Sequence, residues 1–141
     1  MNVFVVVSAA IPTADKFNAL ASKVSAACVR ASKADTIANI VKLHDQDSIV
    51  YGLQCKIITS VVSMELAGDL SDYADTVYVL LTAAIPLQRR MNPIQTNVHS
   101  VYVDRNKAEE VFRNLSGKNI TVNGIACQCH VSIVPTKLDR S

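Results

Sequence analysis

Six side chains in the second half of the chain have the chemistry for catalysis or recognition. An imidazole exchanges protons near neutral pH, and a guanidinium group binds carboxylate or phosphate through paired hydrogen bonds. Loops carry recognition more often than cores do, and two adjacent arginines lie in a segment rich in loop-forming residues. The candidate binding residues are Arg89, Arg90, His99, Tyr102, Asp104 and His130.

The segment His130-Val131-Ser132 resembles the His-x-Ser/Thr element of the two-histidine phosphoesterases, which are two-lobed enzymes. The resemblance implies one such element per lobe, because two imidazoles act as base and acid on opposite sides of the phosphate. The aligned segment of the first half, residues 58–60, has no histidine. In His99-Ser100-Val101 the serine directly follows the histidine, so this segment does not match the His-x-Ser/Thr pattern. The sequence therefore predicts no catalytic residue and favours a protein that is not an enzyme.

The cysteines are Cys28, Cys55, Cys127 and Cys129. Cys127 and Cys129 lie two residues apart on a predicted strand and share a face, so they are poorly placed to form a disulfide with each other. We expect His130 to point to the opposite face of that strand. This spacing does not favour zinc, and the sequence has no glycine-rich phosphate loop. We expect neither a metal nor a cofactor, and we expect buried free thiols rather than disulfides, as in a cytoplasmic protein.

The composition excludes several classes of protein. Half of the 141 residues are hydrophobic and the net charge is +2. Disorder requires low hydropathy and high net charge, and a dedicated nucleic-acid binder requires a larger positive surplus. No apolar run approaches the length of a membrane span. We therefore expect a globular domain without a nucleic-acid or membrane partner.

The chain contains an internal repeat. Residues 3–12 (VFVVVSAAIP) and 77–86 (VYVLLTAAIP) are identical at six of ten positions, at an offset of 74. Further matches follow in the same order, at 32–41 with 106–115 and, after a two-residue slip, at 52–62 with 124–134. The sequence predicts a tandem duplication with copies at 1–74 and 75–141.

Each copy predicts strand, helix or loop, strand, helix, strand, strand. The β-branched runs 3–8 and 77–82 suit strands buried on both faces. Residues 13–24 have helical spacing, but the aligned segment 98–103 alternates like a strand, so we expect a strand at 24–30. Pro93 indicates an irregular segment after the second copy's first strand. Helices are expected at 33–43 and 106–116, a hairpin at 120–127 and a mobile tail at 135–141.

These elements predict an α+β protein with a mostly antiparallel sheet. A unit of about 70 residues is marginal alone, so we expect the two copies to pack about a pseudo-twofold axis as a single domain, residues 1–141.

Residues 98–112, a strand running into an Asp-capped helix, look like a pattern in small accessory proteins of tailed bacteriophages. The resemblance implies a phage-encoded protein of the host cytoplasm. Our leading hypothesis is a non-enzymatic protein-interaction module, with a host protein as its partner. The alternative is a small-molecule or nucleotide-binding protein, or a hydrolase, with a cleft between the copies. Self-assembly through an exposed sheet edge is a further alternative.

Overall fold

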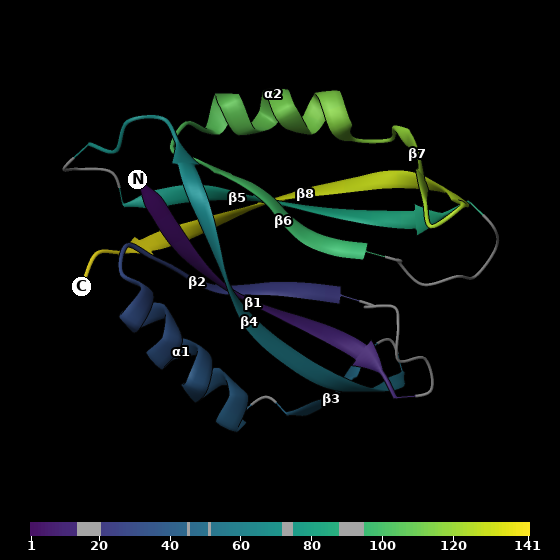
Figure 1. Ribbon diagram of the computed structural model, residues 1–141, viewed down its shortest axis with the longest axis horizontal. Helices are drawn as coiled ribbons and strands as arrows, with labels where there is room; N and C mark the ends of the chain where they lie inside the picture. The colour runs from purple at the N-terminus through teal and green to yellow at the C-terminus, as the bar shows by residue number, and fades with distance from the viewer. Residues whose placement is uncertain (14–20, 45, 51, 72–74, 88–94) are drawn as a thin grey trace.

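The computed structural model describes the chain except residues 14–20, 45, 51, 72–74 and 88–94. Its described part is mostly sheet with two helices (Figure 1). The elements are β1 (Asn2–Pro12), β2 (Ala21–Cys28), α1 (Ala31–His44), β3 (Asp47–Val50), β4 (Leu53–Ala67), β5 (Thr76–Pro86), β6 (Gln95–Tyr102), α2 (Arg105–Leu115), β7 (Asn119–Val122) and β8 (Ile125–Asp139).

Two groups of antiparallel strands form the sheet. In the first group β1 is central and pairs with β2 on one edge and with β4 on the other. In the second group β5 is central and pairs with β6 and β8 in the same way. The short strands β3 and β7 extend the groups as hairpins with β4 and β8.

Two short parallel seams join the groups into a closed six-stranded barrel, in the order β1-β2-β8-β5-β6-β4. In one seam Ala27 and Cys28 of β2 pair with the end of β8. In the other, Leu66 and Ala67 of β4 pair with Val101 and Tyr102 of β6. Each seam therefore holds two residue pairs, and both lie at the same end of the barrel, near the two chain termini (Figure 1).

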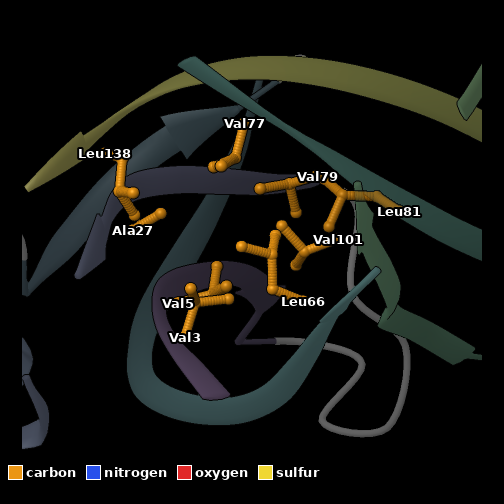
Figure 2. Packing of buried hydrophobic residues seen from close by; sticks show 9 residues of the cluster. All are labelled: Val3, Val5, Ala27, Leu66, Val77, Val79, Leu81, Val101 and Leu138. Carbon is orange, nitrogen blue, oxygen red and sulfur yellow. The ribbon is translucent and has the colours of Figure 1, made fainter. Parts of the chain in front are cut away.

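The main core fills the barrel at this closed end. All six barrel strands contribute to it, and Figure 2 shows their side chains converging from both groups. The cluster consists of Val3, Val5, Ala27, Leu66, Val77, Val79, Leu81, Val101 and Leu138. Because the two groups share these contacts, neither would keep its inner face away from water alone.

The helices cover the outer faces of the two groups. In α1 the buried residues Ala34 and Ala38 are one turn apart and pack with Val6 and Cys28. In α2 the buried residue is Ala108. Alanines at these contacts let each helix lie close to its strands. Both faces of β1 are thus covered near the seams, as the uninterrupted β-branched sequence predicts.

The structure confirms an α+β protein with a mainly antiparallel sheet and corrects two details. Helical spacing over residues 13–24 is misleading, because β2 already begins at Ala21, and residues 14–20 lie outside the described part together with Pro93. The expected mobile tail is wrong. The strand β8 continues to Asp139, and Leu138 is buried in the main core beside the seam.

Neither described helix, of 14 and 11 residues, is long and apolar enough to cross a membrane.

Replacing Leu66 by Ala tests how far the closed end stabilises the fold. Leu66 is 6% exposed and lies both in the core and in the β4–β6 seam. Removal of a buried leucine side chain costs about 2–5 kcal/mol, so we expect a loss of that size in the free energy of unfolding, measured by urea denaturation. The control is Leu43→Ala on α1, where the side chain is 73% exposed and a change within about 0.5 kcal/mol is expected. Equal effects at both positions would contradict the assignment of the core.

Candidate binding cleft

Beyond the seams the two strand groups draw apart, as the right side of Figure 1 shows. Between them is an open cavity of about 540 Å³. Its described lining comes from β4 and β6 on its two sides, with β1, β2 and β5 behind them. The lining residues are Val7, Ala9, Ile11, Ser22, Ile58, Ser60, Val62, Leu81, Thr82, Asn97, Val98 and His99. We call this cavity the β4–β6 cleft.

The lining follows from the alternation of side chains along each strand. On β1 the side chains of Val3 and Val5 fill the core, and Val7, Ala9 and Ile11 continue the same face into the cleft. The cleft is thus the unfilled end of the barrel interior. Its lining is mainly apolar, with hydroxyl groups, one amide and one imidazole among the described residues.

His99 lies at a β-bulge in β6. Leu80 of β5 is opposite Ser100 and Leu81 is opposite Val98, so His99 has no partner on β5. A bulge re-aims the side chain that it carries. The imidazole is exposed, lines the cleft, and its Nδ1 lies 2.9 Å from Oγ of Ser100. Of the predicted site residues that the structure describes, His99 is the one that lines this cleft.

His130 is on β8, opposite Ala83 of β5, and is exposed. Because β5 lies between β6 and β8, the backbones at His99 and His130 are two strand spacings apart, about 10 Å, before their stagger along the strands is added. Side chains of one sheet stand nearly parallel to one another, so this arrangement does not pair the imidazoles as the base and acid of a two-histidine phosphoesterase.

The other predicted site residues lie elsewhere. Tyr102 is in the β4–β6 seam, opposite Ala67 and Tyr78, and is half-buried. Asp104 is the N-cap of α2, where its Oδ1 accepts a hydrogen bond of 2.9 Å from the backbone N–H of Asn106. Neither is among the described residues that line the cleft.

The arginine pair Arg89–Arg90 falls within residues 88–94, outside the described part, so its predicted role in binding stays a prediction.

All four cysteines are free, and three of them, Cys28, Cys55 and Cys127, are buried. Burial raises the pKa of the Cys28 thiol; the Asp139 carboxylate adds to the rise and Lys33 opposes it. Among the described residues, no three His, Cys, Asp or Glu side chains gather as a metal site would require.

Sequence reasoning missed Ile58, Ser60 and Val62, which form the β4 side of the cleft. An apolar residue in a strand is normally assigned to the core, yet Ile58 is 49% exposed. One available signal was the alignment of the copies, which places Ile58 opposite His130 and so marks the position as one where the copies differ.

The chain matches no protein-family model, and comparisons with curated proteins and with solved structures likewise find no match.

The thiols provide a prediction about reactivity. A raised pKa keeps Cys28 protonated in the folded state, while the same thiol ionises at lower pH in the unfolded state. The free energy of unfolding should therefore fall as pH rises through the ordinary thiol range. In native protein at mildly alkaline pH, iodoacetamide should modify partly exposed Cys129 first and Cys28 only after denaturant is added, as peptide mass spectrometry would show. Equal modification rates at the two thiols would contradict this.

Proposed function

We propose that this protein is a non-enzymatic protein-interaction module that binds its partner at the β4–β6 cleft. The observation that carries the proposal is an open, mainly apolar cavity whose one titratable side chain among the described lining residues is that of His99. Acid–base catalysis generally needs a second group of opposite role within hydrogen-bond reach. Recognition needs only shape, apolar area and polar groups at the rim.

The exposed residues support binding of a macromolecule. Ile58 lies on one side of the cleft at 49% exposure, with the half-buried Val62 and the exposed Ser60 beside it on the same strand face. Apolar side chains exposed together and bordered by polar groups commonly mark protein interaction sites. The tailed-phage resemblance and the cytoplasmic location stay predictions; together they favour a host protein as the partner.

A second candidate is a small-molecule-binding protein. The cavity volume of about 540 Å³ is within the range of ligand pockets, roughly 300–1,000 Å³. A bound small molecule would accept or donate hydrogen bonds at Asn97 and His99. Native mass spectrometry of freshly purified protein separates the two candidates, because a retained ligand adds a fixed small mass that denaturation removes.

We also infer that the chain arose by tandem duplication and that its halves are related by a pseudo-twofold axis. The strand registers support this: Phe4 lies opposite Ser63 on β4, and Tyr78, 74 residues later, lies opposite Pro135 on β8. The register shift in the outer pairs, β1–β2 and β5–β6, also recurs at an offset of 74. The Sγ atoms of Cys55 and Cys127 each point to the carbonyl group two residues earlier, at 3.5 and 3.4 Å.

Site-specific photo-cross-linking tests the proposed function. A benzophenone amino acid is placed at Ile58, in the cleft, and in a matched control at Arg113, an exposed position of α2. After irradiation in the cells that produce the protein, we expect a discrete protein adduct from position 58 and none from position 113. Sequencing of the cross-linked peptide identifies the partner.

Two outcomes of that experiment would contradict the proposal. Adducts of equal yield from both positions would indicate non-specific contact. A position-58 variant that forms no protein adduct, together with a retained small mass in the native spectrum, would favour the small-molecule candidate.

A further inference from the structure

The strand β4 has an unpaired edge along the cleft. Between Ile58 and Glu65 the described pairing of β4 is with β1 alone, and the open edge begins after Ile57, which donates its N–H to the carbonyl of Gln46 beside β3. Leu66 donates its N–H to the carbonyl of Met1 on the β1 side, and the carbonyl of Ala67 accepts from Val103 on the opposite side. Backbone groups alternate in direction along an antiparallel strand. The odd-numbered residues therefore direct N–H and C=O groups into the cleft, and these residues are Thr59, Val61, Ser63 and Glu65.

The strand β6 has a matching edge on the other side of the cleft. Over Gln95–Ser100 its described pairing is with β5 alone, and pairing with β4 begins at Val101. Two parallel strands thus diverge from a shared seam with their unpaired edges toward the cavity. An inserted strand takes up two strand spacings, about 9.5 Å in all, and six residues of it would extend about 20 Å.

The second gap between the groups, between β2 and β8, is different. Leu138 donates its N–H to Asp75 on the β5 side, so the odd-numbered residues of β8 face β2. Pro135 is one of them, and it has no N–H to offer an added strand. Proline on an open edge is a common way of preventing strand addition. At the corresponding place on the cleft side is Ser63, which keeps its N–H.

The charged residues along the β4–β6 cleft indicate what kind of segment could bind there. The described strands along the cleft, β1, β4, β5 and β6, contain one carboxylate, Glu65, at the closed end. At the wide end Lys42 and Lys56 line a pocket together with Ile58. The acid there is Asp47 on β3, directly opposite Lys56, so the described side chains of that pocket carry two positive charges and one negative charge. A segment with its negative charge at the wide end would complement this arrangement.

We propose that the β4–β6 cleft binds an extended segment of another protein as an added strand, antiparallel to β4 and β6, with its acidic C-terminal end at Lys56. The proposal rests on the proposed interaction function and specifies its partner segment. Main-chain hydrogen bonds to both edges supply affinity, and small β-branched side chains of the segment pack on Val7, Ile58 and Val62.

The probe is a nine-residue synthetic peptide in which valine and threonine alternate and the last two residues are aspartate. Titration into isotope-labelled full-length protein, followed by NMR, should shift the amide signals of residues 59–65 and 95–100 and slow hydrogen exchange at Thr59, Val61 and Ser63. A peptide with the aspartates at its N-terminus should bind more weakly. Unchanged signals in both edges at millimolar peptide would overturn the proposal.

The variant Ser63→Pro tests strand addition most directly. It places a proline on the open edge of β4, at the position that corresponds to Pro135 on the edge of β8. Ser63 is exposed and its N–H faces the cleft, so no hydrogen bond within the sheet is lost. The substitution removes one main-chain hydrogen bond to the peptide and places the proline ring against the peptide backbone. The dissociation constant of the peptide should therefore rise about tenfold. The matched control Ser63→Ala retains the N–H and should bind within about twofold of the unmodified protein. Equal affinity of the two variants would overturn the proposal.

If Ser63→Pro does not fold, a peptide N-methylated at alternate residues makes the same test on unmodified protein, and undiminished binding of that peptide overturns strand addition. A peptide-free protein that doubles its mass with concentration, and protects the same amides, identifies a second copy as the occupant and also overturns it. A position-58 cross-link to a partner that persists unchanged in Ser63→Pro retains the interaction function and overturns only strand addition.

Discussion

The structure depends on two parallel seams of two residue pairs each. They are the places where the two strand groups exchange backbone hydrogen bonds along their edges, and both lie at one end. Strands of a twisted sheet rotate relative to their neighbours, so edges that meet at one end separate unless pairing continues along them. The closed core and the open cleft are therefore two results of the same geometry. A longer seam would fill the cleft with the protein's own strands.

The two strand groups differ in the polar side chains at corresponding positions. In the first, the hydroxyl groups of Ser8 and Thr59 lie 2.8 Å apart in a buried position on the outer face of the sheet. In the second, Thr82 faces Val131, which offers no hydrogen bond. Two unmatched pairs, Ile58 against His130 on the inner face and Ser63 against Pro135 on the outer face, are those that would make the two gaps bind differently. Differences between the halves thus fall on both core and edge positions.

Local patterns in the sequence predicted most elements, and non-local pairing explains what they missed. The turn at Asn123-Gly124, with both residues at positive φ, has the dipeptide preferred in tight hairpins. The sequence also predicted the N-cap of α2 at Asp104 and the end of this helix at Gly117. The seams were not, because each depends on a few residues whose partners are more than thirty positions away. Leu138 looked like part of a mobile tail for this reason. For the site, His99 could be selected by residue type, whereas Ile58 could not, because its exposure results from strands that diverge.

The positions of the termini determine how the protein can be attached to anything else. The carbonyl of Met1 accepts a hydrogen bond from Leu66, and that of Asp139 accepts one from Val29, so both ends of the chain are held at the seams. The side chain of Arg140 also donates to the carbonyl of Ser71, in the connection between the groups. All three points lie at the closed end, whereas the residues that line the cleft are at the opposite ends of the strands. A tether, a label or a surface joined at either terminus would therefore present the cleft outward.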